Sequence, residues 1–183
     1  GTGWKHTYLI TDKIDQITKI PPSHRFAKLP APRSVKIEVS PRCNFRCGFC
    51  ALRTRESQPR EDMDFDLFRR ITAEMREAGV EEIGVFYLGE SFMAPELLRD
   101  CVKWCKDIGF PYVFLTTNAS LCDREALEPV LAAGLDSLKF SVNASDPVQF
   151  AEVMGVSPKY FHKAIKNIRM AKALGSPAFR VVL

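Results

Sequence analysis

The sequence contains no run of about 20 consecutive apolar residues, the length that a membrane-spanning helix needs. Its N-terminal region also lacks the continuous apolar segment of a secretory signal peptide, because Thr11–Lys19 is polar and charged. No stripe of lysines and arginines is interleaved with aromatic residues, so we expect no nucleic-acid-binding surface. These absences predict a cytoplasmic protein that binds neither a membrane nor a nucleic acid.

The formal net charge of +4 is unevenly distributed along the chain. Residues 1–33 hold six Lys or Arg side chains and two Asp, which leaves 20 of the 26 basic residues and 20 of the 22 acidic residues for the rest. Four prolines between positions 21 and 32 interrupt any regular element there. We therefore expect residues 1–33 to be an extension or linker, and residues 34–183 to form one domain with its own core.

From Ser34 onward, short apolar segments alternate with segments whose apolar residues recur at helical spacing. The apolar segments predict strands over 35–39, 83–88, 112–116, 137–142 and 179–183. Each helix is expected to lie between a capping residue and a glycine that ends it, namely Asp64–Gly79, Pro95–Gly109, Asp123–Gly134 and Ser157–Gly175. This alternation indicates an α/β fold with a parallel sheet and right-handed crossovers. Since the chain stops on its fifth strand, we expect the sheet or barrel to be incomplete and the natural protein to be longer.

Polar residues follow the expected strands at the ends where ligands gather in parallel α/β folds. The cysteine-containing segment 43–50 follows the first strand, and Gly89-Glu90 follows the second. Thr117-Asn118 comes after the third strand, and Ser141 with Asn143 closes the fourth. Four successive strands are therefore expected to direct polar side chains to one rim of the sheet.

Three of the six cysteines, Cys43, Cys47 and Cys50, lie within eight residues. Thiolates held so close repel one another unless a positive group lies between them, and a metal ion or metal cluster is the usual partner. A structural zinc site would need a fourth protein ligand, which His24 or Cys122 could supply. With three protein ligands, an iron–sulfur cluster keeps one metal corner open for an exogenous molecule.

The Cys-x3-Cys-x2-Cys spacing after the first strand, with aromatic Phe49 before the last cysteine, resembles the signature of the radical S-adenosylmethionine (radical SAM) superfamily. The resemblance covers about residues 34–183 and implies a partial (β/α)6 TIM-like barrel. It implies that Cys43, Cys47 and Cys50 hold a [4Fe–4S] cluster, whose fourth iron is chelated by the amino and carboxylate groups of S-adenosylmethionine. Phe49 would then pack near the adenine.

Further segments resemble motifs of this superfamily at the ends of later strands. Leu88-Gly89-Glu90-Ser91 resembles its Gly-Gly-Glu-Pro motif, in which the glutamate accepts hydrogen bonds from the cofactor's ammonium group and the glycine allows close approach of the backbone. Ser141-Val142-Asn143 resembles a Ser-x-Asp segment that contacts the ribose and the methionine end of the cofactor, and Thr117-Asn118 resembles a Thr-Asn turn. The cofactor-binding residues that the resemblance implies are Phe49, Gly89, Glu90, Asn118, Ser141 and Asn143.

The resemblance implies a reductive mechanism that requires no acid–base dyad, so no catalytic side chain is assigned. An external reductant such as flavodoxin or ferredoxin would reduce the cluster, and cleavage of S-adenosylmethionine would give a 5′-deoxyadenosyl radical that abstracts hydrogen from the substrate. The long helix expected after Asn143 favours the SPASM/twitch-type branch, and the substrate is then a peptide, a protein or a small molecule.

Two alternatives remain open at this stage. Within the enzyme class, the same chemistry could act on a sugar, a nucleoside or another small metabolite. In a different class, the protein could be a non-catalytic iron–sulfur electron-transfer protein or a structural zinc protein.

Overall fold

The computed structural model describes residues 22, 30–54, 57, 59–175 and 180–182. Its contacts divide the chain into two units between Ala31 and Pro32. Nearly all of the first unit lies outside the described residues, and so does the strand and helical turn that apolar residues between 8 and 20 suggest. The role of residues 1–33 as an extension or linker stays a prediction.

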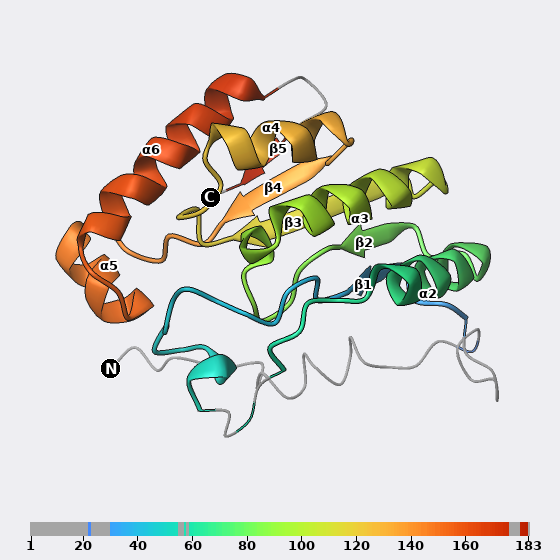
Figure 1. Cartoon of the computed structure of the whole chain (residues 1–183), viewed down its shortest axis with the longest axis horizontal. Coiled ribbons are helices and arrows are strands. Elements are labelled where there is room, and N and C mark those ends of the chain that lie inside the picture. Colours follow the sequence, from blue (N-terminus) through green and yellow to red (C-terminus); the bar gives the residue numbers. More distant parts are fainter. Residues whose placement is uncertain (1–21, 23–29, 55–56, 58, 176–179, 183) are drawn as a thin grey trace, which may run out of the picture. The chain divides into compact units, whose positions relative to one another are not determined.

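In the described part of the chain, five short parallel strands form one sheet in the order β1-β2-β3-β4-β5 (Figure 1). Every strand therefore lies beside its neighbour in sequence, and a crossover joins each pair. The predicted α/β fold with a parallel sheet is confirmed. The strands are β1 (Ser34–Lys36), β2 (Glu82–Gly84), β3 (Tyr112–Thr117), β4 (Ser137–Phe140) and β5 (Arg180–Val182).

Strands β1 and β2 end earlier than the apolar segments 35–39 and 83–88 predict. Beyond Lys36 and Gly84 only single ladder bonds continue, such as the one that the Val85 N–H donates to the Phe114 carbonyl at 3.0 Å. Further along this segment, the Leu88 and Gly89 N–H groups both donate to the Glu38 carboxylate. The end of this segment is therefore bonded to a side chain, and the strand is shorter than its apolar segment.

The four predicted helices are confirmed, with ends close to the expected caps. They are α2 (Phe65–Glu77), α3 (Pro95–Asp107), α4 (Arg124–Ala132) and α6 (Lys159–Leu174). The Asp64 side chain accepts the Leu67 N–H at 2.7 Å, and the Asp123 side chain accepts the Ala126 N–H at 3.1 Å. Such bonds satisfy backbone donors that the first turn of a helix leaves unpaired.

Helix α5 (Pro147–Met154) is an element that the apolar periodicity does not predict. Asp146 caps it by accepting the N–H groups of Val148 and Gln149 at 2.8 and 2.9 Å, Pro147 occupies its first turn, and Gly155 ends it with a φ of +63°. Eight residues are too few to show a repeated apolar stripe, so only these cap signals were available.

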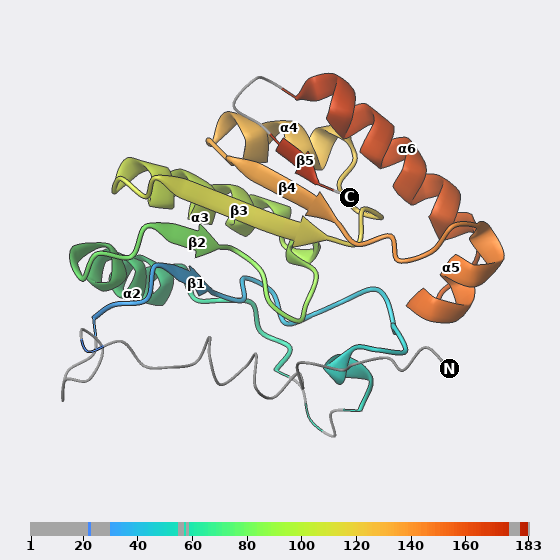
Figure 2. The ribbon, with the colours of Figure 1, turned by 180° about the vertical axis from the view of Figure 1, so that it is seen from behind.

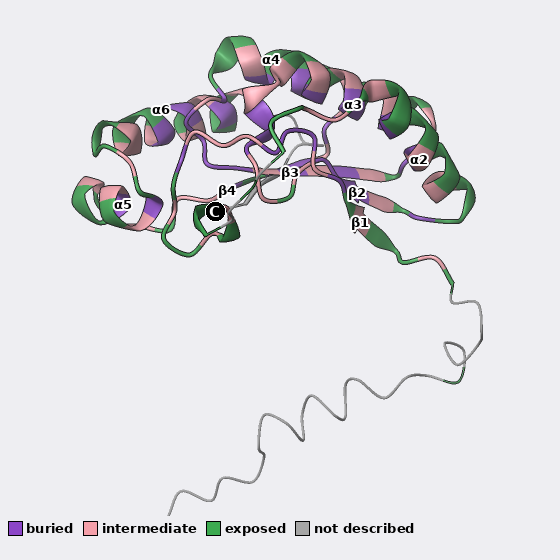
Figure 3. Cartoon of the chain, turned by 60° about the horizontal axis from the view of Figure 1, so that its bottom comes forward, coloured by how far each residue is buried: buried purple, intermediate pink, exposed green. Residues whose placement is uncertain are grey.

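Helices α2, α3 and α4 cover one face of the sheet (Figures 1 and 2). Buried residues line the sides of these helices that face the strands, and exposed residues line their outer sides (Figure 3). In β3 the burial alternates, so that Val113 and Leu115 are buried while Phe114 and Thr116 are only partly covered. The core therefore lies between the strands and the helix layer, as the period-two pattern of a strand requires. Among the described residues no helix is both long and apolar enough to cross a membrane.

Three of the six cysteines belong to this core. Cys101 and Cys105 are fully buried on α3, and Cys122 is fully buried in the turn before α4. Burial raises the pKa of all three thiols, to about 12 for Cys105 and Cys122. A thiol that stays protonated and surrounded by apolar atoms acts as a small hydrophobic residue.

Candidate active site

The three predicted metal ligands lie in the loop after β1 and line one cavity of about 420 Å³. Burial is the main cause that raises the pKa of Cys43 and Cys47, and repulsion from the other two thiols helps to raise that of Cys47 to about 11. Repulsion of this kind is relieved when a cationic metal centre takes the three thiolates. The donor set of Cys43, Cys47 and Cys50 thus fits a metal centre.

The three thiols line one cavity, as the ligands of a metal cluster do. A zinc ion binds sulfur at about 2.3 Å and so needs its ligands drawn tightly around one point. Across the described ranges, no three His, Cys, Asp or Glu side chains converge in this way. A four-iron cluster is larger and binds one thiolate per iron, which suits ligands that line a cavity without touching.

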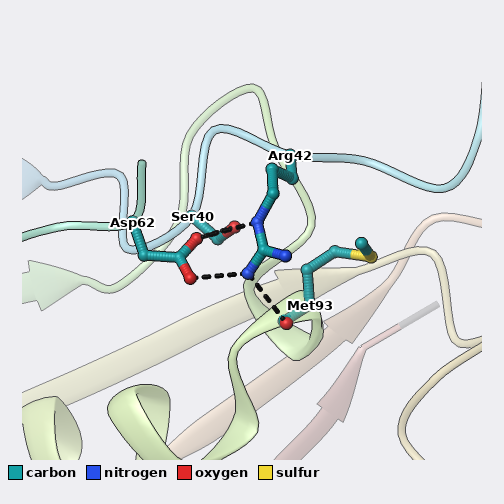
Figure 4. Close-up of polar contacts among 4 residues, drawn as sticks. All are labelled: Ser40, Arg42, Asp62 and Met93. Atoms are coloured by element: carbon teal, nitrogen blue, oxygen red, sulfur yellow. Dashed lines mark hydrogen bonds and ion pairs between the residues drawn. The ribbon is translucent and has the colours of Figure 1, made fainter. Parts of the chain in front are cut away.

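Asp62 holds the start of the cysteine loop, the segment 40–50 that follows β1 (Figure 4). The Ser40 hydroxyl donates to Asp62 Oδ1 at 2.6 Å, and the Arg42 guanidinium donates to both carboxylate oxygens, at 3.1 Å to Oδ1 and 2.5 Å to Oδ2. Arg42 also donates to the Met93 carbonyl at 3.2 Å, at the end of the 3-10 turn η3 (Ser91–Met93). Two-point charge-assisted bonds are geometrically specific, so this contact sets where the loop leaves the sheet.

We expect Asp62→Ala to lower the free energy of unfolding by about 1 kcal/mol, because the pair is partly exposed and also involves Ser40. In a domain of this size the melting temperature should fall by about 2–4 °C. Thermal unfolding followed by circular dichroism measures this shift. Asp107→Ala is the matched control, since it removes an exposed ion pair with Lys103 and should change stability by less than about 0.5 kcal/mol. Equal shifts in the two variants would contradict a special role for Asp62.

The middle of the cysteine loop rests on the C-terminus of α5. The Arg46 N–H donates to the Met154 carbonyl at 3.3 Å, and the Gly48 N–H donates to the Val153 carbonyl at 2.9 Å. The last carbonyls of a helix lack partners within the helix, so the loop satisfies them. At Gly155 an added Cβ would lie 2.2 Å from the Arg46 carbonyl oxygen. The helix that the periodicity does not predict is therefore one of the supports of the metal-binding loop.

Glu90 is buried at the end of the segment after β2 and lines the same cavity. Its Oε1 accepts the Thr117 hydroxyl at 2.8 Å and the Phe92 N–H at 3.1 Å, and its Oε2 accepts the Asn118 N–H at 2.8 Å. Burial is the largest influence on this carboxyl and raises its pKa, against the lowering effect of the three hydrogen bonds. A carboxylate offers about four acceptor positions, so Glu90 can still accept a hydrogen bond from a ligand.

Gly89 places the backbone next to the start of the cysteine loop. A Cβ at this position would lie only 1.9 Å from the Ser40 carbonyl oxygen, so only glycine allows this approach. The Glu38 side chain accepts the N–H groups of Leu88 and Gly89 at 2.9 and 2.8 Å, and the Glu90 N–H donates to the Arg42 carbonyl at 2.8 Å. Glu38 is thus a positioning residue absent from the predicted set.

A hydrogen-bonded triangle joins the cysteine loop to the turn after β3. The Asn118 amide donates to Asn44 Oδ1 at 3.0 Å, and the Asn44 amide donates to the Ser120 hydroxyl at 2.8 Å. Ser120 in turn donates to Asn118 Oδ1 from its hydroxyl at 2.7 Å and from its N–H at 3.0 Å. Because Asn118 also donates its N–H to Glu90, the triangle couples the cysteine loop to that carboxylate.

The structure brings most of the predicted cofactor-binding residues to the cavity. Phe49, Gly89, Glu90, Asn118 and Ser141 line it together with the three cysteines. Asn143 is exposed, does not belong to the lining, and has its amide 3.8 Å from the Met154 sulfur. The roles of all six residues toward a cofactor stay predictions. The lining also includes residues that the motifs do not indicate, among them Arg53, Phe86, Tyr87, Thr116 and Met154.

Residues 37–183 match the family model of the radical SAM superfamily. The chain belongs to this superfamily. Radical SAM enzymes use a [4Fe–4S] cluster and S-adenosylmethionine, so the family confirms the cofactors that the cysteine spacing implied. The three thiols that line the cavity are a donor set that fits the cluster, and the Glu90 carboxylate lies in the same lining.

Several known proteins are similar to this radical SAM chain. A protein named probable GTP 3′,8-cyclase from Methanococcus maripaludis is 28% identical over 121 residues, which cover 66% of this chain and 40% of the relative. A protein of the same name from Sulfolobus acidocaldarius is 30% identical over 144 residues, 77% of this chain and 43% of the relative. This chain therefore spans about two fifths of the length of the curated relatives that it matches.

Solved structures of low sequence identity share the fold. The crystal structure of Streptococcus suis SuiB bound to S-adenosylmethionine has a TM-score of 0.70 and 22% identity, covering 94% of this chain and 38% of SuiB. The crystal structure of HydG, a maturase of the [FeFe]-hydrogenase, has a TM-score of 0.66 and 17% identity, covering 81% and 34%. These likenesses confirm the partial TIM-like fold of the radical SAM type.

Proposed function

We propose that this chain is the radical-generating domain of an enzyme that acts on a small molecule. The observation that carries the proposal is that Cys43, Cys47 and Cys50 from one loop and Glu90 from the next strand end line one cavity. Cys43, Cys47 and Cys50 would hold the cluster, which would supply the electron for reductive cleavage of S-adenosylmethionine and so the radical chemistry that removes a hydrogen atom from the substrate. The electron comes from an external reductant of the flavodoxin or ferredoxin type.

The side chains that line the cavity bind the two cofactors and orient them. The three thiolates hold the cluster, and Glu90 accepts a hydrogen bond from the ammonium group of S-adenosylmethionine while its other acceptor positions stay bonded to the protein. Phe49 and Tyr87 are 65% and 62% exposed at the cavity, so their rings are available to cover the adenine and exclude water. Ser141 offers a hydroxyl to the ribose.

A small molecule is the substrate class that the relatives favour over a peptide or protein. Two of the curated relatives are named for a cyclisation of GTP. SuiB has also been solved with a precursor peptide, but at 23% identity this likeness concerns the fold alone. Membership of the SPASM/twitch-type branch stays a prediction, and a second cysteine-rich region after Leu183 would support it.

Anaerobic reconstitution with iron and sulfide tests the function. We expect about four irons and four sulfides per chain, and formation of 5′-deoxyadenosine when S-adenosylmethionine and dithionite are added. Iron analysis and chromatography of the products measure both. Zinc without sulfide would favour the structural alternative, and a full cluster that yields no 5′-deoxyadenosine would favour an electron-transfer protein.

We expect Glu90→Gln to weaken the binding of S-adenosylmethionine by about tenfold or more, since a hydrogen bond to a charged group contributes about 1.5–3 kcal/mol. The iron content should stay near that of the wild type, because Glu90 is no cluster ligand in this proposal. Isothermal titration calorimetry of the reconstituted, unreduced protein with S-adenosylmethionine, in the absence of dithionite, gives the dissociation constant. Glu74→Gln on the exposed side of α2 is the control. An unchanged dissociation constant in Glu90→Gln would remove this residue from the site.

A further inference from the structure

Helices α5 and α6 carry a local excess of positive charge. Between Pro147 and Leu174 the sequence holds five lysines and arginines and a single acidic residue, Glu152. Residues 34–183 as a whole contain 20 basic and 20 acidic side chains, so this excess is not a property of the whole domain. All five cations belong to α6 and are exposed, namely Lys159, Lys163, Lys166, Arg169 and Lys172.

The fold of α6 does not account for these charges. In the described part of the chain, no ion pair involves a side chain of this helix. Lys159, Lys163 and Lys166 follow one another at spacings of four and three residues, at which like charges repel each other and weaken a helix. Lys159 is also the first residue of α6, where the helix dipole disfavours a positive charge. The charges therefore indicate a contact outside the chain.

The first turn of α6 lies against the cysteine loop. The Phe45 ring, which lies between Cys43 and Cys47 in sequence, meets the Tyr160 ring edge-on with centroids 5.5 Å apart. Phe45 is buried and donates its N–H to the Cys43 sulfur at 3.5 Å, whereas Tyr160 is partly exposed. The Lys159 ammonium group lies 5.7 Å from the centre of the Tyr160 ring. Two rings in contact thus join the predicted cluster ligands to the basic end of α6.

The cysteine loop adds one more cation at this point. Arg46 is exposed, and its guanidinium donates to two carbonyls of the loop at 3.2 and 3.0 Å. Its own N–H donates to the Met154 carbonyl at 3.3 Å, so Arg46 lies beside the link from α5 to α6. No ion pair of the described residues involves Arg46. We call Arg46, Lys159, Tyr160 and Lys163 the basic patch.

We propose that the basic patch docks an acidic protein that donates single electrons from a flavin or an iron–sulfur centre. The inference rests on the proposed function, which needs an electron from outside the chain, and it names the surface where the donor binds. Opposite surface charges steer two proteins together and raise their rate of association. The donor loses one electron to the oxidised cluster, and no bond forms or breaks. Contact between Tyr160 and Phe45 keeps the docked donor near Cys43.

Two measurements on the anaerobically reconstituted chain test the proposal, with an acidic [2Fe–2S] ferredoxin and an acidic flavodoxin as probes. Isothermal titration calorimetry with the oxidised probe gives the affinity, and stopped-flow absorbance gives the rate at which the reduced probe reduces the cluster. We expect Lys159→Glu and Lys163→Glu each to lower both quantities by about tenfold at low ionic strength. Added salt should weaken binding to the wild type, because it screens exposed charges.

Lys172→Glu is the matched control, since it makes the same charge reversal at an exposed position of the same helix. It lies about 20 Å along the helix axis from Lys159, which is about two Debye lengths at 0.1 M salt. We therefore expect its affinity and rate to stay near those of the wild type. The photochemically formed 5-deazaflavin radical is a small neutral reductant that needs no docking, so it should reduce the cluster equally fast in all variants.

Three outcomes would overturn the assignment: binding of neither probe, equal effects of Lys159→Glu and Lys172→Glu, or an equal slowing of reduction by 5-deazaflavin. Tighter binding of a single-stranded oligonucleotide than of either probe would overturn it in favour of a nucleic acid. Formation of 5′-deoxyadenosine with dithionite is measured on the same samples and should persist in Lys159→Glu. If the wild type forms none, the proposed function fails whatever the binding shows, so the two failures are distinguishable.

Discussion

Cys47→Ala should abolish formation of 5′-deoxyadenosine and reduce the iron content from about four per chain to near the background. Each of the three cysteines binds one iron in a site of this type, and the fourth position belongs to S-adenosylmethionine. Removal of one thiolate leaves two protein ligands, and the cavity that Cys47 lines holds no further cysteine beyond Cys43 and Cys50 among the described residues. Anaerobic reconstitution, iron and sulfide analysis and product chromatography measure the loss.

Cys101→Ala is the matched control for this experiment, because it removes a thiol from α3 that is buried in the core. We expect this variant to keep its four irons and its product, and to lose only stability, by about 1 kcal/mol for a small buried group. Circular dichroism of both variants shows whether either fails to fold, and Cys47→Ser retests the ligand role with less change in volume. A full cluster in Cys47→Ala, or an equal loss of iron in Cys101→Ala, would contradict the assignment of ligands.

The sheet and four of its helices could be predicted because their signals are local. Val35–Val39 has an apolar residue at every second position, Tyr112–Thr116 is nearly all apolar, and caps such as Asp64 and Asp123 accept bonds from residues three positions away. That the three cysteines of segment 43–50 line one cavity could be predicted for the same reason, since all three occur within one short loop. Local patterns are sufficient wherever the interacting groups are neighbours in sequence.

The supports of the site could not be predicted because they join distant segments. Asn44 and Asn118 are 74 positions apart, and Glu38 is 51 positions from the Gly89 N–H that it accepts. In the sequence, Glu38 is one of two charged residues in the segment 35–39, and no local pattern distinguishes its role from that of Lys36 two positions earlier. Only the parallel order of β1, β2 and β3 brings these groups together, and only in the folded chain is it determined which polar residue accepts a backbone bond.

Of these supports, Glu38 bonds directly to Gly89, where the backbone after β2 lies against the start of the cysteine loop. We expect Gly89→Ala to lower the free energy of unfolding by about 3 kcal/mol, the upper part of the range for overpacked sites. The reason is that the added Cβ would lie 1.9 Å from the Ser40 carbonyl oxygen and 2.8 Å from the Pro41 carbonyl carbon, and backbone atoms cannot rotate away as a side chain does. The melting temperature should fall by about 6–12 °C in a domain of this size.

Gly48→Ala separates this effect from a general cost of replacing glycine in the loop region. There the added Cβ would meet only the mobile end of Arg53 at 3.2 Å and the Val153 carbonyl at 3.8 Å, so the change should stay within about 0.5 kcal/mol. Adding Ser40→Gly to Gly89→Ala should restore nothing, because the clash involves the backbone oxygen of Ser40 rather than its side chain. Melting curves of the three variants test this explanation. Recovery of the melting temperature in the double variant would contradict it, and so would equal shifts of the melting temperature in Gly89→Ala and Gly48→Ala. Either result would show that close approach of the backbone is not the reason for glycine at position 89.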